Sequence, residues 1–288
     1  MMVIPPQFEV ASNFQEGRAR IKINGKWGYL TDNGKIGARF EFDDVGDFSQ
    51  GLARVSIGGK WGFVGKFLES YIPPMYDGAM NFREGLASIK FGDTWGVLKY
   101  PDVIIVEPQY DEVSYFCDGL AAFKTQGKWG FIDKIGKIVI EPQFDRAGGF
   151  VDDLAVVSTG GKWGFIDKAG KIAIEPQFKL ASTFCEGLAK IKIGDKWGFI
   201  DKAGKIAIEP QFEKVGDFQE GLSWFNFGRK FGYIDKTGRI IIEPQFDDVS
   251  DFCEGLAGFG INGKFGFINK EGKIAIRAKY DKVGSFHA

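Results

Sequence analysis

The sequence predicts an all-β fold of eight tandem repeats, and three observations lead to this prediction. An aromatic-Gly dipeptide recurs every 34 residues without insertion or deletion. Each repeat contains short runs of alternating apolar and polar residues, separated by Gly-containing turns, which is the pattern of half-buried strands. No segment keeps a helical period. The aromatic residues, which we interpret as structural, are Trp27, Trp61, Trp95, Trp129, Trp163, Trp197, Phe231 and Phe265.

The unit that starts at Leu188 shows the expected elements. Residues 188–193 alternate and predict one strand, and the turn after them leads into a second strand at residues 196–201. Both faces of that second strand are apolar or bare, so we expect both to be covered. Residues 205–209 form a third strand, which Pro210 ends because proline has no N–H to donate. Each unit is therefore predicted to be a three-stranded antiparallel meander followed by a longer loop.

Two recurring residues of the unit, the dipeptide glycine and the hairpin aspartate, have physical reasons for their positions. Glycine within a strand weakens it unless something must come close, so Gly198 predicts that a ring or backbone of the adjacent unit packs over its bare Cα. The aspartate that opens the second hairpin is expected to accept hydrogen bonds from the turn backbone. One carboxylate per loop falls short of a calcium site. These aspartates are Asp133, Asp167, Asp201 and Asp235.

Stacking of the units would bury their aromatic faces, so the predicted architecture is an open, twisted β-solenoid. The chain is one array over residues 1–288, and residues 1–16 and 272–288 share a repeat phase and would act as end caps. The alternative is a closed, eight-bladed propeller-like ring. Three strands per unit are fewer than the four of a usual propeller blade, which favours the solenoid.

The unit GKWGFIDKAGKIAIEPQF at residues 161–178 resembles the WG-repeat (KWG-repeat) family. The resemblance covers residues 3–286, is strongest around Trp129, Trp163 and Trp197, and weakens between Gly62 and Tyr110. It implies a mostly bacterial β-repeat protein that is presumed to be an interaction module. It provides no catalytic signature that could be transferred to this chain.

Composition excludes several function classes. Net charge is −1 and pI about 6.0, so no bulk field attracts nucleic acid or anionic membrane. A single histidine, His287, argues against a His-rich metal site and a Ser-His-Asp triad. We therefore expect no enzyme, no catalytic residue, no cofactor and no metal. Without a signal peptide or an apolar membrane span, the expected location is the cytoplasm.

The three cysteines lie two repeats apart, which is too far for a disulfide. They are expected to be unreactive loop residues of a protein from a reducing compartment. Their positions are Cys117, Cys185 and Cys253.

Two charged rows are candidate partner-binding features. An acidic row lies before the loop glycine, and Gln50 interrupts it. A basic row lies on the second hairpin and could dock an extended charged partner, although solvated turn residues that keep strand edges soluble are the favoured explanation. The acidic residues are Glu16, Glu84, Asp118, Asp152, Glu186, Glu220 and Glu254, and the candidate binding lysines are Lys134, Lys168, Lys202, Lys236 and Lys270.

Trp224 stands where other units hold small, basic or short residues on the polar side of the first strand. It is a candidate partner-binding residue, because Trp is enriched at binding centres. The alternative is packing across neighbouring side chains. The resulting functional hypothesis is a non-enzymatic protein-binding or scaffold module. The alternatives are a self-associating structural protein and a binder of carbohydrates or other small ligands in aromatic grooves between units.

Overall fold

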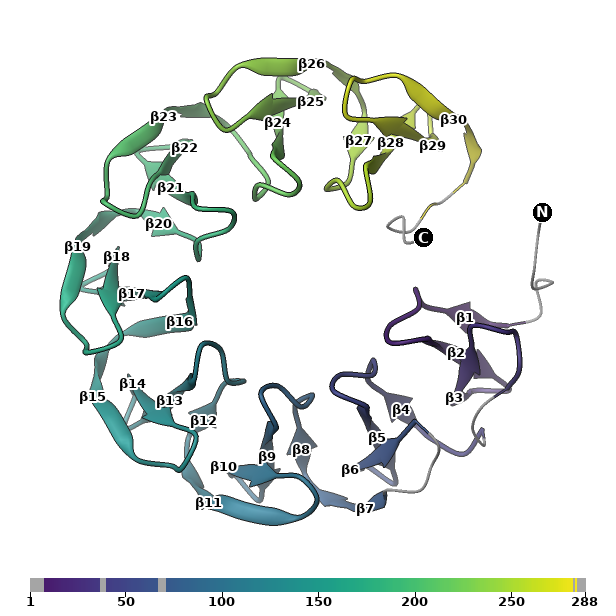
Figure 1. Ribbon diagram of the computed structural model, residues 1–288, viewed down its shortest axis with the longest axis vertical. Coiled ribbons are helices and arrows are strands. Elements are labelled where there is room, and N and C mark those ends of the chain that lie inside the picture. Colours follow the sequence, from purple (N-terminus) through teal and green to yellow (C-terminus); the bar gives the residue numbers. More distant parts are fainter. Residues whose placement is uncertain (1–7, 37–39, 67–70, 282, 284–288) are drawn as a thin grey trace. The chain divides into compact units, whose positions relative to one another are not determined.

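The computed structural model describes residues 8–36, 40–66, 71–281 and 283, and it divides into two compact units, Met1–Phe144 and Asp145–Ala288. In these described residues the strands form eight antiparallel sheets of three or four strands (Figure 1). Each sheet with its loops is called a blade below. The predicted end caps lie partly outside the described residues, at positions 1–7, 282 and 284–288.

The first unit contains four blades. Their strands are β1 (Val10–Ala11), β2 (Arg18–Ile23) and β3 (Lys26–Thr31); β4 (Asp44–Val45), β5 (Leu52–Ile57), β6 (Lys60–Gly65) and β7 (Tyr71–Tyr76); β8 (Gly78–Ala79), β9 (Leu86–Phe91), β10 (Thr94–Lys99) and β11 (Val103–Tyr110); and β12 (Glu112–Val113), β13 (Leu120–Thr125), β14 (Lys128–Asp133) and β15 (Ile138–Phe144).

The second unit also contains four blades. Their strands are β16 (Arg146–Val151), β17 (Leu154–Thr159), β18 (Lys162–Asp167) and β19 (Ile172–Phe178); β20 (Leu180–Ala181), β21 (Ala189–Ile193), β22 (Lys196–Ile200) and β23 (Ile206–Phe212); β24 (Leu222–Phe227), β25 (Lys230–Asp235) and β26 (Ile240–Phe246); and β27 (Asp248–Val249), β28 (Leu256–Ile261), β29 (Lys264–Asn269) and β30 (Ile274–Tyr280).

The predicted aromatic-Gly strand is the third strand of each four-stranded blade, and the expectation that both its faces are covered is confirmed. In β22, Phe199 and Ile200 are both buried. The tryptophan of the dipeptide is half-buried, and Lys192, directly opposite on β21, holds its ammonium 5.5 Å from the Trp197 ring centroid. This cation–π contact covers the outer part of the ring.

Most blades contain one more strand than predicted. The loop after the E-P-Q-F segment was expected to be irregular, but in the regular blade β20 pairs Leu180 with Lys192 and Ala181 with Ile191. A strand of two residues is too short to show the alternation that identifies strands in a sequence. The prediction of three-stranded units is therefore wrong for six of the eight described sheets, which have four strands.

The close approach predicted at the dipeptide glycine is confirmed, but its partner differs. A Cβ on Gly198 would lie 2.5 Å from the Ile208 carbonyl oxygen and 2.7 Å from the Pro210 nitrogen. These atoms belong to β23 of the same blade, where a bulge in the Glu-Pro-Gln segment crosses β22. The glycine is thus required by the blade's own outer strand.

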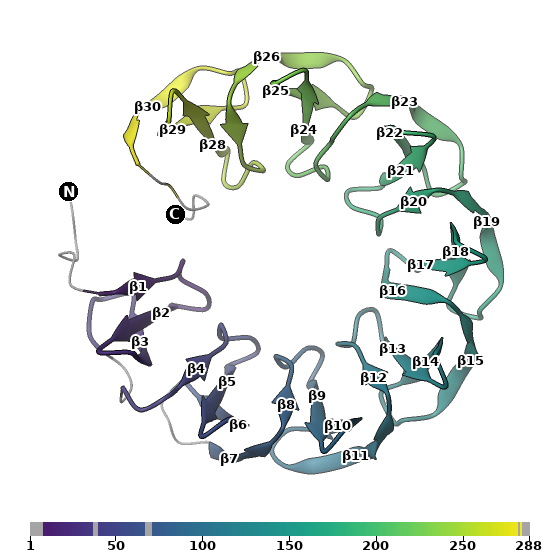
Figure 2. The same ribbon diagram turned by 180° about the vertical axis from the view of Figure 1, so that it is seen from behind.

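The predicted open solenoid is wrong, and the eight sheets are blades of a β-propeller. Every strand pair among the described residues lies within one blade, so the sheets do not continue into one another. Neighbouring blades instead pack face to face: Phe165 of β18 contacts Phe184 of the next blade, with ring centroids 4.9 Å apart. Within each unit the blades fan out, with the outer strands on the convex side and the loops after the first strands on the concave side (Figure 2).

Candidate functional site

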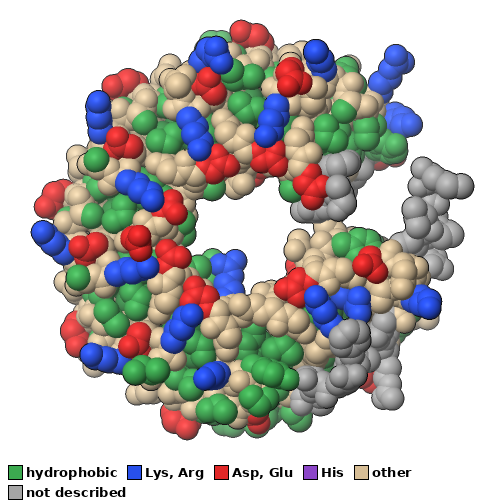
Figure 3. Space-filling model, in the orientation of Figure 1, with side chains coloured by type: hydrophobic (Ala, Val, Ile, Leu, Met, Phe, Trp, Pro, Cys, Tyr) green, Lys and Arg blue, Asp and Glu red, His purple; other side chains and the backbone are tan. Residues whose placement is uncertain are grey.

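The predicted acidic and basic rows pair with each other between neighbouring blades. The Lys134 ammonium lies 2.8 Å from Glu84, and the Lys236 ammonium lies 3.1 Å from Glu186, each acid 50 positions before its lysine. Figure 3 shows basic side chains beside acidic ones on the blades. A partner-binding role for the lysines stays a prediction. Further pairs of this kind are Lys66–Glu16, Lys202–Asp152 and Lys270–Glu220, whereas Lys168 contacts Asp153.

We call each of these acid–lysine pairs an inter-blade clamp. The acid of a clamp also hydrogen-bonds to the backbone of the equivalent loop in the next blade. The Glu186 carboxylate accepts hydrogen bonds from the N–H groups of Glu220 and Gly221 at 2.6 and 3.0 Å. Burial alone would raise the pKa of Glu186, but the hydrogen bonds from Lys236 and these two N–H groups outweigh it and hold the pKa below its ordinary value of 4.5. The acidic row is therefore a set of inter-blade clamps.

The interruption in the acidic row has a structural counterpart. Gln50 occupies an acidic-row position, and Tyr100 stands 50 residues later where six other blades have a lysine. Gln50 keeps the backbone contact by accepting a hydrogen bond from Gly85 at 2.8 Å. The Tyr100 ring instead packs edge-on against Phe82 at 6.4 Å. Acid and base are thus absent from the same clamp.

Trp224 is half-buried and lies between two blades. Its indole packs over Gly216, where an added Cβ would come within 2.4 Å of the indole nitrogen. The ring contacts Phe231 edge-on at 5.7 Å and the core around Tyr233 and Phe252. This placement matches the packing alternative, and its role in partner binding stays a prediction.

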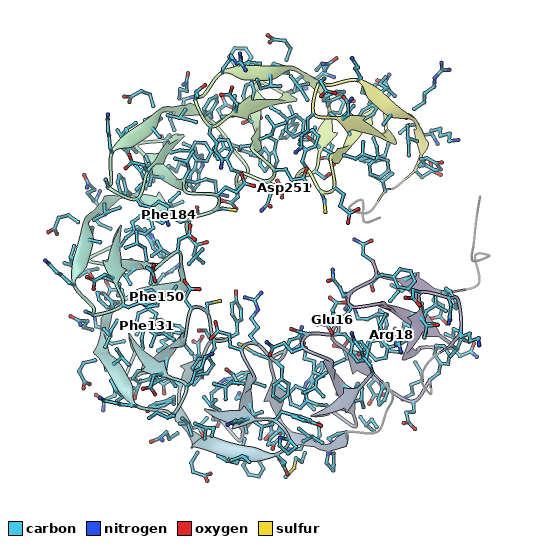
Figure 4. The ribbon with its side chains drawn as sticks, viewed as in Figure 1. Glu16, Arg18, Phe131, Phe150, Phe184 and Asp251 are labelled. Atoms are coloured by element: carbon cyan, nitrogen blue, oxygen red, sulfur yellow. The ribbon has the colours of Figure 1, made fainter. Side chains whose placement is uncertain are left out.

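The Trp224 position makes the same kind of inter-blade contact in two other blades. Trp224 hydrogen-bonds to Asp251, on the concave side of its unit (Figure 4), 27 residues later. The same spacing joins Lys190 to Asp217 at 3.1 Å and Arg20 to Asp47 at 2.6 Å. Burial, together with the charge of Asp217, raises the pKa of Asp251, while the Trp224 hydrogen bond acts in the opposite direction.

A pocket of about 520 Å³ lies where the repeat is least regular. It is formed between the outer strand β7 of one blade and β9–β11 of the next. Ile89 is fully buried at its floor, and Met75 and Phe91 are exposed at its walls. Its lining residues are Met75, Tyr76, Ile89, Phe91, Thr94, Asp102, Ile104, Glu107 and Pro108.

Three of the lining residues depart from the repeat. Met75 stands where five later blades have glutamine, Thr94 where every other blade has lysine, and Asp102 where six other blades have the hairpin glycine. The first and second changes replace polar or long side chains by apolar or short ones, and the third adds a carboxylate. The pocket is therefore lined in part by residues that depart from the repeat.

The polar groups of the pocket converge from two blades. The Tyr76 hydroxyl of β7 hydrogen-bonds to Asp102 from the β10–β11 hairpin. Burial, with the adjacent Asp102 charge, raises the pKa of Tyr76, so its hydroxyl stays a donor. Glu107 and Thr94 supply a second carboxylate and a hydroxyl. Among the described residues, no Lys, Arg or His lines the pocket.

Sequence reasoning missed this site, although a signal for it existed. The repeat pattern weakens between Gly62 and Tyr110, the stretch that contains the pocket residues. Asp102 and Glu107 place two carboxylates in one pocket, which the charged rows of the regular repeat did not indicate. By contrast, the predicted turn role of Asp201 is confirmed, since its carboxylate accepts hydrogen bonds from Ala203 and Lys205. The three cysteines form no disulfide among the described residues.

Solved structures with a similar fold support the propeller assignment. A crystal structure of the eukaryotic initiation factor superposes with a TM-score of 0.67 at 9% identity, covering 96% of this chain and 90% of that one. Dihydro-heme d1 dehydrogenase NirN reaches a TM-score of 0.50 at 12% identity, covering 95% and 75%. At such identities the likeness concerns the fold alone.

No curated protein matches the sequence. The described residues contain no helix long and apolar enough to cross a membrane. The family model described as "WG containing repeat" matches along the chain and leaves residues 96–102, which include Asp102 of the pocket, unmatched. Its matches cover residues 1–27, 27–61, 61–95, 103–129, 129–163, 163–197, 197–231, 231–265 and 265–288. The chain belongs to the WG-repeat family.

Proposed function

We propose that this protein is a non-enzymatic binding protein that takes a small organic ligand into the pocket between β7 and β9–β11. The pocket itself is the main observation that supports this proposal. Its volume of about 520 Å³ lies within the range of small-molecule sites. Apolar walls with a few convergent polar groups are the usual composition of such sites. The modified residues Met75, Thr94 and Asp102 build it in one blade pair.

Binding accounts for the polar groups better than catalysis does. Two carboxylates in one pocket are the minimum of a glycoside hydrolase, in which one must act as an acid and the other as a nucleophile or base. Asp102 already accepts the Tyr76 hydrogen bond, which suits a fixed acceptor. The described residues contain no cluster of three or more His, Cys, Asp or Glu side chains suited to a metal ion. These groups suit orientation of a ligand.

The test is a titration of methyl-labelled protein with 2-phenylethanol and 2-phenylethylamine, followed by NMR. The methyl signals of Met75 and Ile104 are expected to shift with either probe. Thr94→Lys introduces the side chain of the other blades, and it should weaken binding at least about tenfold by filling the pocket. Thr159→Lys makes the same change on an exposed hairpin of the second unit and should leave binding unchanged. Absence of shifts with both probes, or binding unaffected by Thr94→Lys, would contradict the proposal.

A protein-binding scaffold is the second candidate function, and a recurring exposed residue favours it. The last position of the strand before the aromatic-Gly strand carries a large apolar side chain in six blades and is exposed in four of them, with Phe227 77% exposed. Exposed aromatic residues are enriched at binding centres. The other three are Ile57, Phe91 and Ile193.

Phe227→Ser tests this second candidate by affinity capture from a bacterial lysate at low and high salt. A partner that the parent retains at both salts should be lost by the variant, while Thr159→Ser retains it. Equal capture by all three proteins would contradict this use of Phe227. Size measurement over a range of concentrations separates a protein partner from self-association, because growth of the protein alone would favour the latter.

A further inference from the structure

We propose that the pocket selects an organic cation, specifically a primary ammonium group on an apolar or aromatic stem. The proposal rests on the proposed ligand-binding function and assigns its ligand class. It follows from the charge of the pocket, from the position of its carboxylates at the rim and from the apolar surface behind them. Each of these three features differs from, or adds to, what the regular blades provide.

The first step is a missing cation. At the position of Thr94 the other blades have a lysine. In five of these blades its ammonium pairs with an acid 17 residues later, as in Lys60–Asp77 and Lys230–Asp247, both at 2.5 Å. The corresponding acid for Thr94 is Asp111, next to the Trp95–Tyr110 pair of β10 and β11. Among the described residues Asp111 has no ion-pair partner. The threonine therefore leaves negative charge near the pocket without its usual counter-ion.

The second step is an added anion. Asp102 replaces the glycine of the regular hairpin, and its carboxylate lies at the pocket together with that of Glu107. Both side chains belong to exposed residues, so ionisation requires no burial of charge. Compared with a regular blade, the site has lost one positive charge and gained one negative charge.

The third step is the apolar surface beside these carboxylates. Phe91 is 57% exposed and Met75 is 47% exposed, and both line the pocket over the buried Ile89. An aromatic face and a thioether beside anionic oxygens suit a cation with an apolar stem, since the ring face attracts positive charge and the stem is removed from water. A neutral ligand would use the apolar wall alone, and an anion would be repelled by the rim.

The arrangement assigns a role to each group. The ligand ammonium lies at the rim between the carboxylates of Asp102 and Glu107, and the Thr94 hydroxyl can accept a further hydrogen bond from it. The stem extends over Phe91 and Met75 toward Ile89. The Tyr76 hydroxyl holds the Asp102 carboxylate in place, so Tyr76 is a positioning residue.

The experiment compares three probes of similar shape and different charge at pH 7 and low salt: 2-phenylethylamine, 2-phenylethanol and phenylacetate. Two exposed carboxylates should favour the amine over the alcohol by about five- to tenfold. That preference should shrink at high salt, because screening acts on exposed charges. Phenylacetate should bind more weakly than the alcohol. The readouts are dissociation constants from the Met75 and Ile104 methyl shifts.

Charge-removing variants give the decisive comparison. Asp102→Asn keeps an acceptor for Tyr76 but removes the charge, and with Glu107→Gln it should reduce the amine preference to less than about twofold while alcohol binding stays the same. Glu209→Gln is the matched control, because it is the same Glu-Pro-Gln residue in a regular blade. It should leave the preference intact.

The outcomes separate the two proposals. Equal binding of amine and alcohol at the pocket, or a preference that survives the double variant, overturns cation selection and leaves the ligand-binding function standing. No binding of any probe overturns both. Shifts confined to residues outside the pocket would place the probes elsewhere and overturn both as well.

Discussion

The blade from β8 to β11 and the blade from β20 to β23 share the same strand packing, called the frame below, and differ in the residues of their hairpins, called the rim. In both blades the outer strand passes close to the dipeptide glycine. A Cβ added to Gly96 or Gly198 would lie 2.4 or 2.5 Å, respectively, from a carbonyl oxygen of that strand. Ile89 and Ile191 are fully buried at equivalent positions. The differences are Thr94 in place of Lys196 and Asp102 in place of Gly204. A repeat thus acquires a site through its hairpins while its core stays the same.

The strongest test of the shared frame is Gly198→Val. The added side chain meets backbone atoms of β23, which cannot move without breaking the β22–β23 pairing. We expect loss of the folded state or destabilisation by more than about 4 kcal/mol, measured by denaturant unfolding. Gly96→Val should be equally damaging if the irregular blade keeps the same frame. Ala207→Val is the control, because Val139 already occupies that position in another blade.

A midpoint for Gly198→Val equal to that of Ala207→Val would contradict the close approach. Damage in Gly198→Val without damage in Gly96→Val would instead show that the irregular blade has a looser frame. That result would separate the two blades at their core as well as at their rim.

A second comparison sets Trp224 against Lys190, which occupy the same position in successive blades. Trp224→Ala should cost about 3 kcal/mol, because it empties the space over Gly216 and leaves Asp251 without its donor. Trp224→Lys should cost less, since lysine can pair with Asp251 as Lys190 pairs with Asp217. The measurement is chemical denaturation of both variants. Equal losses would show that packing alone, and not the contact with Asp251, gives this position its importance.

The repeat, the hairpins, the Asx turns and the buried third strand could be predicted from the sequence, because they depend on local patterns such as the alternation around Ile191 or the Asp201 turn. The arrangement of the blades could not be predicted, because it depends on contacts between repeats. The spacing of 50 between Glu186 and Lys236 shows why: the two rows appear as separate stripes until neighbouring blades bring them together. The Leu180–Ala181 strand and the pocket around Met75 likewise arise from pairing and packing that no single repeat displays.

The clamps predict a modest acid sensitivity. The pKa of Glu186 is lowered in the folded protein, so its contribution to stability is present above its unfolded pKa near 4.5 and is lost as pH falls through the lower folded value. Glu186→Gln should therefore cost less than about 1 kcal/mol at pH 7, because the pair is solvent-screened. The cost should shrink as the pH falls below 4.5. Unfolding at pH 7 and at a series of lower pH values measures it, and a cost that does not shrink would show that the amide fails to replace the backbone hydrogen bonds to Glu220 and Gly221.

The smallest expected effect concerns the rim itself. Thr94→Lys returns the irregular blade to the pattern of the others and supplies Asp111 with the partner that Asp77 and Asp247 already have. The melting temperature should rise by no more than about 2 °C, because exposed pairs contribute little. Asp111→Asn should cancel the rise, which a double-mutant cycle measures. A loss of stability would mean that Thr94 holds the blade together. A neutral or slightly positive change would instead fit a threonine that the fold does not require and that serves the pocket.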